Sequence, residues 1–186
     1  DGLSLPADFE RPAWDAEGLL GEAPRWGRFW ESPAFSAPER DLVQRARERA
    51  RQLLDDCVAD GTDFGLIHAD FVRENIIAGP RGLALIDFDD SGFGFRLYDL
   101  ASALTQSLEE PRLPLLVRSL VAGYRELRDL PHELEGRLAL FLLLRTFASA
   151  GWVVGRAGPD DPRHRVFTRR AVLMARHVLA GTAPWD

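Results

Sequence analysis

Apolar residues recur at helical spacing over much of the chain, and the first long run follows residue 36. Ser36 and Glu39 fit a capping box, the pair of residues that closes the N-terminus of a helix. The apolar positions that then follow three and four residues apart are Leu42, Ala46, Ala50, Leu53, Leu54, Cys57 and Val58. This pattern predicts a helix that ends at Gly61, with Arg and Glu side chains on its solvent face.

Four further helices are predicted downstream. Their expected ranges are 98–107, 114–127, 131–150 and 162–179, and prolines stand at or near the helix starts at positions 111, 114, 131 and 162. The third helix is apolar on nearly all sides, which indicates a buried core helix. Its uncharged run from Leu138 to Leu144 is much shorter than the roughly 20 residues that a membrane span requires, so we expect no membrane partner.

The rest of the pattern predicts short strands and one irregular arm. Strands are expected near residues 65–68, 75–78 and 83–87, and Gly79-Pro80-Arg81-Gly82 supplies a turn between the last two. Residues 1–38 lack a clean period, so they predict an arm fixed to the folded body by its aromatic side chains: Phe9, Trp14, Trp26, Phe29 and Trp30. The predicted fold class is mainly α with a small β-hairpin element.

Composition narrows the function classes. The chain has 186 residues, of which 46% are apolar, which suits one domain or one lobe of a larger protein. A formal charge of −6 argues against a nucleic-acid surface and tolerates neutral or cationic substrates. Cys57 is the single cysteine, which excludes an intrachain disulfide and fits a cytoplasmic setting. The acidic, proline-rich start does not resemble a signal peptide.

The chemistry is concentrated in residues 65–101. His68, Asp70 and Asn75 follow one short apolar run, in the pattern H-x-D-x-x-x-x-N, and Asp87 follows another. Phosphoryl transfer needs a carboxylate to orient the attacking hydroxyl and hard oxygen ligands for Mg²⁺. An Asp or Asn beside a turn is usually a cap, and a lone His usually has a structural role. Four such residues in this order, each beside an apolar strand, favour a catalytic site instead.

This stretch resembles the C-terminal lobe of the aminoglycoside phosphotransferase and choline-kinase-like superfamily, which shares its core with protein kinases. His68-Ala69-Asp70 with Asn75 is similar to the catalytic loop of that family, although many relatives carry glycine where Ala69 stands. The segment from Ile86 to Asp90 is similar to its metal-binding segment, and residues 98–101 are similar to the helix start that follows.

The resemblance implies a role for each residue. Asp70 would be the general base or hydroxyl-orienting group, and Asn75 and Asp87 would hold Mg²⁺ against the phosphates of ATP. The structural supports would be His68, which braces the loop, and Asp99, which fixes it through backbone hydrogen bonds. Arg73 is a candidate phosphate contact, with an exposed arginine as the equal alternative. Asp89 would assist a second metal, meet a cationic substrate or remain a solvated turn carboxylate, and the role of Asp90 is left open.

The largest departure from the family is what the sequence lacks. Kinases of this type place a glycine-rich hairpin and a strand lysine over the nucleotide. All 23 basic residues here are arginines, and Gly92-Phe93-Gly94 lacks the third glycine of such a hairpin. We therefore expect a helical C-lobe over residues 39–186, with a catalytic loop (65–79) and a metal-binding segment (83–91). The ATP-binding N-lobe is expected to lie outside this chain, so that the chain alone is inactive.

The resemblance implies an ATP- and Mg²⁺-dependent transfer to a hydroxyl of a small molecule. Homoserine-, hydroxylysine- or aminoglycoside-like acceptors and a protein Ser or Thr stay open, with specificity in the helices after Tyr98 and in the loop 152–163. The alternatives are a non-catalytic pseudokinase-like binding module and a metal-dependent phosphohydrolase that uses His68, Asp70 and Asp87. Self-association through exposed apolar surface is also allowed.

Overall fold

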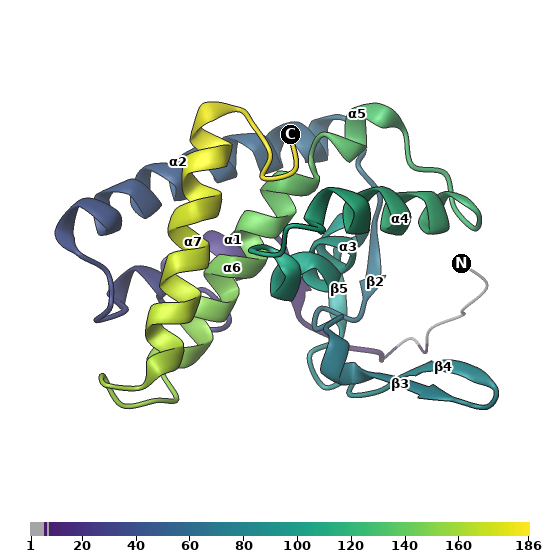
Figure 1. Ribbon diagram of the computed structural model, residues 1–186, viewed down its shortest axis with the longest axis horizontal. Helices are drawn as coiled ribbons and strands as arrows, with labels where there is room; N and C mark the ends of the chain where they lie inside the picture. Colours follow the sequence, from purple (N-terminus) through teal and green to yellow (C-terminus); the bar gives the residue numbers. More distant parts are fainter. Residues whose placement is uncertain (1–5, 7) are drawn as a thin grey trace.

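The computed structural model describes residues 6 and 8–186, and it is a helical body with two small sheets at one side (Figure 1). The helices are α1 (Ala16–Leu20), α2 (Ala37–Ala59), α3 (Arg96–Leu104), α4 (Leu113–Arg125), α5 (His132–Glu135), α6 (Leu138–Val154) and α7 (Pro162–Ala180). Short 3-10 turns are η1 (Phe29–Glu31), η2 (Arg73–Asn75) and η3 (Thr105–Ser107). The mainly helical fold class is therefore confirmed.

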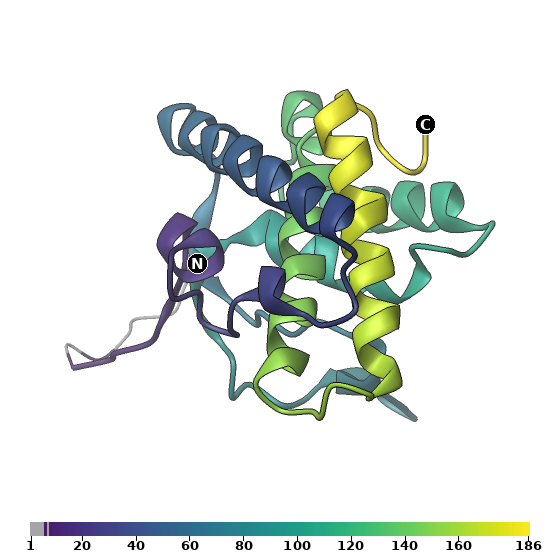
Figure 2. The same cartoon turned by 90° about the vertical axis from the view of Figure 1, so that its left-hand side faces the viewer.

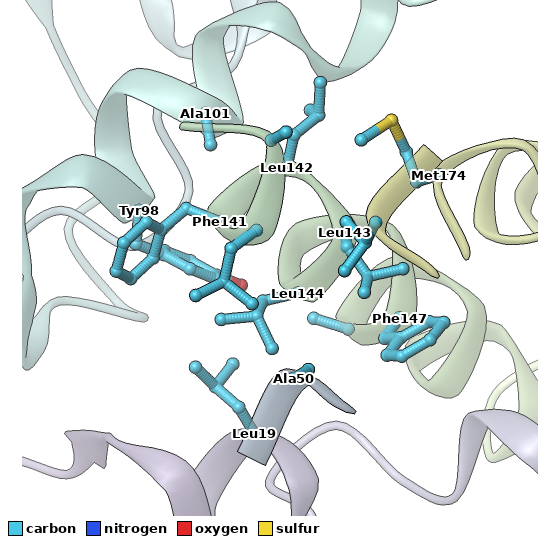
Figure 3. Packing of buried hydrophobic residues seen from close by; sticks show 14 of the residues in the cluster. Leu19, Ala50, Tyr98, Ala101, Phe141, Leu142, Leu143, Leu144, Phe147 and Met174 are labelled. Carbon is cyan, nitrogen blue, oxygen red and sulfur yellow. The ribbon is translucent and has the colours of Figure 1, made fainter. Parts of the chain in front are cut away.

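Helix α6 is the centre of the body. It is buried along nearly its whole length and packs against α7 and α3, as its apolar sequence predicts. Figure 3 shows Phe141, Leu142, Leu143, Leu144 and Phe147 meeting side chains from other elements in this core. None of the described helices has the length and apolar character that crossing a bilayer would demand.

The ends of the two long surface helices follow local sequence signals. The capping box of Ser36 and Glu39 is present at the start of α2, which confirms the predicted helix start. Helix α7 begins at Pro162 behind an Asp161 cap and stops at Gly181, which has a left-handed φ of 68°. Helix α2 crosses α7 and packs on it, and α7 in turn packs along α6 (Figure 2).

One helix prediction is wrong. Residues 131–150 do not form a single helix, because the chain makes the short α5 and then a new helix from Leu138. Between the two, Arg137 donates hydrogen bonds to the side chains of Asp60 and Thr62 at the end of α2. This contact between residues far apart in the sequence stabilises the break between α5 and α6. The apolar pattern alone does not show that break.

The two sheets carry the site segment. Strands β3 (Ile76–Gly79) and β4 (Gly82–Leu85) form the expected hairpin, with Gly79 opposite Gly82. A second sheet has the strand order β1 (Ala13–Trp14), β5 (Gly92–Phe95), β2 (Phe64–Ile67), and of these only the strand near residues 65–68 is predicted from the sequence. A Cβ on Gly92 would lie 2.3 Å from the carbonyl oxygen of Pro12, so this close strand approach requires glycine.

The N-terminal residues pack on the body through aromatic rings. Trp14 stacks on Tyr98 with ring centroids 5.8 Å apart, and Phe29 stacks on Phe147 at 3.9 Å. Figure 2 shows the turn that contains Phe29 beside α6. Residues 1–5 and 7 of the predicted arm lie outside the described residues, and the division at residue 38 stays a prediction.

Candidate active site

The predicted catalytic loop follows the end of β2 at Ile67, and Asp99 of α3 binds its backbone. The carboxylate of Asp99 accepts hydrogen bonds from the backbone N–H groups of His68 (2.7 Å) and Ala69 (2.8 Å). Burial raises the pKa of Asp99 above its usual value, although these two donors act in the opposite direction. Ala69 has a left-handed φ of 66°, a conformation that favours glycine. Asp99 thus fixes the strained residue directly before Asp70.

His68 connects the two loops of the site. Its Nε2 lies 2.9 Å from the carbonyl oxygen of Ile86, and its Nδ1 accepts the backbone N–H of Asp70 at 3.3 Å. This pattern assigns the proton to Nε2, which donates to Ile86. Asp87, the next residue, also has a left-handed φ, of 63°. One imidazole therefore sets the backbone on both sides of the predicted site.

Asp70, Asn75 and Asp87 line one cavity of about 480 Å³. The other lining residues are Trp26, Val72, Glu74, Asp90, Thr105, Gln106, Arg145, Ser149, Trp152, Phe167 and Arg170. Asn75 donates from Nδ2 to both the backbone oxygen and Oδ2 of Asp70, each at 2.9 Å. The amide oxygen of Asn75 takes no part in these bonds, so it is the atom that a cation would use.

This donor set fits a magnesium ion that keeps other ligands. Asn75 and Asp87 offer an amide and a carboxylate oxygen, which Mg²⁺ prefers, and phosphate oxygens and water would complete an octahedron. Within the described part of the chain, no three His, Cys, Asp or Glu side chains gather into a metal cluster. This observation gives no support to the phosphohydrolase alternative, which requires a self-sufficient cluster.

The acidic residues after Asp87 lie differently. Asp90 lines the cavity, and the pKa of its carboxyl is raised by burial and by the nearby charge of Asp70. Its backbone oxygen accepts the indole N–H of Trp14 at 2.9 Å. Asp89 is exposed and does not line the cavity, and its backbone oxygen accepts from Arg11. Of the two, only Asp90 is in a position to meet a small molecule in this cavity.

Arg73 points away from the cavity lining. Its guanidinium donates to the hydroxyl of Ser107 and, at 2.6 Å, to the carboxylate of Glu110. Its backbone N–H donates to the side chain of Gln106. These contacts join the catalytic loop to the turn after α3, and a phosphate contact by Arg73 stays a prediction.

The sequence reasoning missed Arg145. This residue lies in the middle of α6, its side chain is 8% exposed, and its Nη2 lies 2.6 Å from Oδ1 of Asp70. The guanidinium also lies over the ring of Trp26, 4.8 Å from the ring centroid. The available signal was a lone charge in an apolar helix, which is costly unless it has a partner.

The chain was compared with known proteins. The phosphotransferase enzyme family matches residues 4–138. The chain belongs to this family. An uncharacterized protein of Deinococcus radiodurans is 33% identical over 167 residues, which cover 84% of this chain and 47% of that protein. The solved structure of a microcompartment-associated aminopropanol kinase has a TM-score of 0.85 and 32% identity, and the match covers 96% of this chain and 57% of that one.

Two consequences follow from family membership and coverage. The predicted resemblance to the phosphotransferases is confirmed, and the fold is that of a solved kinase. The chain spans only about half the length of the relatives that it matches, 47% of one and 57% of the other.

Proposed function

We propose that the protein is an ATP- and Mg²⁺-dependent phosphotransferase that transfers the γ-phosphate to a hydroxyl group of a small molecule. The observation that carries this proposal is the arrangement of Asp70, Asn75 and Asp87, which come from two loops and line one cavity. Family membership supplies the reaction class.

Each residue has one task in this mechanism. Asp70 orients the acceptor hydroxyl and takes its proton as the new phosphate bond forms. Asn75 and Asp87 would hold Mg²⁺, and the bound ion would supply positive charge that neutralises the phosphates. His68 and Asp99 set the backbone around these groups through the bonds described above.

We propose further that the nucleotide is held mainly by residues outside this chain. The sequence has no lysine to pair with the phosphates and no complete glycine-rich hairpin. The relatives that it matches are about twice as long as the part that the chain covers, which supports one lobe of a longer enzyme. The isolated chain should accordingly bind ATP weakly.

An amino alcohol is the acceptor that the cavity suits best. The carboxyl of Asp90 and the aromatic rings of Trp26 and Trp152 line the same cavity as Asp70. A carboxylate beside aromatic faces favours an ammonium group, which would leave the hydroxyl of the same molecule for Asp70. The kinship with an aminopropanol kinase agrees with this acceptor class.

The test is a phosphotransfer assay of the full-length protein with Mg²⁺ and ATP over amino alcohols, aminoglycosides, choline, homoserine and a generic protein acceptor. Asp70→Asn should lower turnover of the best acceptor by about 10²–10⁴-fold and spare ATP binding, because it removes the base while the proposed metal ligands Asn75 and Asp87 remain. Asp41→Asn, which changes an exposed carboxylate on α2, is the matched control and should leave turnover unchanged. Turnover that survives in Asp70→Asn contradicts the assignment, and no turnover of any acceptor with retained ATP binding favours the pseudokinase-like alternative.

A further inference from the structure

Arg145 is a buried cation with an unusual set of contacts. It lies within α6 among apolar neighbours, and 6% of the residue is exposed. Among the residues that the structure describes, the carboxylate of Asp70 is its ion-pair partner, and its Nε and Nη1 have no hydrogen-bond acceptor. A leucine at this position would fit the helix pattern without this burden. The charge is therefore not explained by the stability of the core.

The contacts of Asp70 explain the charge instead. Arg145 donates a hydrogen bond to Oδ1 of the carboxylate at 2.6 Å, and Asn75 donates one to Oδ2 at 2.9 Å. The two donors come from different elements, α6 and the catalytic loop, so together they fix the plane of the carboxylate. Each carboxylate oxygen can accept a second hydrogen bond, which leaves capacity for the hydroxyl of an acceptor.

The N-terminal segment holds Arg145 in turn. The ring of Trp26 covers the guanidinium, and the neighbouring residue Gly27 lies directly against Gly151, farther along α6. A Cβ on Gly151 would lie 2.3 Å from the carbonyl oxygen of Gly27, so the two backbones are in contact. Ser149 adds a hydrogen bond to the carbonyl oxygen of Arg145 within the helix. Trp26 thus covers the guanidinium of Arg145, and Ser149 binds its backbone.

We infer that Arg145 is a positioning residue for Asp70: it holds the carboxylate in the orientation in which it meets the acceptor hydroxyl. This inference rests on the proposed function. It predicts that loss of Arg145 affects the rate of the chemical step more than the binding of either substrate, because small misplacements of a reacting group are costly.

The experiment compares Arg145→Met, Arg145→Lys and Arg47→Met in the full-length protein. Arg47 is the matched control, because it is also a buried arginine over a tryptophan ring, at 4.1 Å from that of Trp30, but lies outside the cavity. Arg145→Met should lower kcat about 10–100-fold with KM values within about 2-fold, and Arg145→Lys should recover part of the loss. Arg47→Met should keep the kcat of the folded protein.

Two results would overturn the inference. One is kinetic: the kcat of Arg145→Met stays within about 2-fold of the wild type, or the kcat of Arg145→Lys is no higher than that of Arg145→Met. The other needs no turnover: a crystal structure of Arg145→Met in which the carboxylate of Asp70 keeps its place against Asn75. The second readout separates this inference from the proposed function, because it decides the role of Arg145 even for a protein that phosphorylates no acceptor in the panel.

Discussion

Two buried arginines lie over tryptophan rings in this protein, and their hydrogen bonds differ. Arg47 on α2 lies over Trp30 and donates to the carbonyl oxygens of Leu20 and Gly21 and to the carboxylate of Glu22, each at 2.8 Å. Arg145 on α6 lies over Trp26 and has the carboxylate of Asp70 as its hydrogen-bond acceptor, while its Nε and Nη1 are unpaired among the described residues.

The difference separates a structural arginine from a functional one. A buried cation with several acceptors joins segments of the chain and adds to stability. A buried cation with unpaired donors costs stability, so its presence is better explained by what it does to its partner. Arg47 fixes the segment after α1 to α2, whereas Arg145 acts on the candidate base.

The largest expected effect on stability separates the two arginines directly. Arg47→Met should lower the free energy of unfolding by about 2–4 kcal/mol, because backbone acceptors and a carboxylate lose a charged donor. Arg145→Met should lower it less, by about 1–2 kcal/mol: Asp70 loses its cation, but this carboxylate is partly exposed and keeps the Asn75 hydrogen bond, and the variant no longer buries unpaired guanidinium donors. Urea unfolding of both variants measures this, and equal losses would remove the distinction.

The next effect concerns the backbone contact that sets Trp26 over Arg145. Gly151→Ala should cost about 1–3 kcal/mol, because its Cβ would meet the carbonyl oxygen of Gly27 at 2.3 Å and the backbone must shift. Gly123→Ala in α4 is the control, because a Cβ there meets nothing within 4 Å. The control should gain up to about 1 kcal/mol from its helix position. Thermal unfolding of the two variants tests this contrast.

A smaller change acts on the rings themselves. Trp26→Phe and Trp30→Phe should each lose about 1 kcal/mol of stability, because the smaller ring buries less apolar surface and is a weaker cation–π partner for the arginine. Only Trp26→Phe should also lower kcat, by a few-fold, since Trp26 lines the acceptor cavity and its arginine contacts Asp70. A kcat that falls equally in both variants would contradict the separation of roles.

The last effect is absent at neutral pH and appears only in alkali, as a pH dependence beside Arg145. Burial raises the pKa of Tyr98 to about 12, although the Arg145 charge opposes the shift. Because the folded state keeps this proton while the unfolded state releases it near pH 10, stability should fall as the pH rises from about 10 towards 12. An ultraviolet titration of wild-type protein against Tyr98→Phe measures the ionisation, and a difference spectrum that appears already at pH 10 would contradict it.

Local signals were enough to predict most helices, the hairpin turn and the residues of the central loop. The capping box at Ser36 and the turn at Gly79–Gly82 depend on neighbours in sequence, and so they were visible in the pattern. The left-handed φ of Ala69 was not predicted, because an alanine does not mark a positive φ as a glycine would.

The features that were missed all depend on distant contacts. Strand β5 contains Gly92 and Gly94, and glycines at this spacing are typical of a loop. In the structure they allow Pro12 and Trp14 to lie close against the strand. The role of Arg145 was missed because its partner Asp70 is 75 positions away in the sequence. No local pattern of residues tells which loop such a charge will meet.

The parallel pairing of β1 with β5 has a practical consequence for protein production. Ala13 and Trp14 cover the outer edge of β5, and the backbone N–H of Phe93 donates to Pro12 just ahead of them. Trimming the polypeptide back to the start of α1 would uncover that edge, and a bare strand edge recruits other chains. Truncated versions that begin at α1 are expected to aggregate, whereas versions that retain β1 should remain in solution.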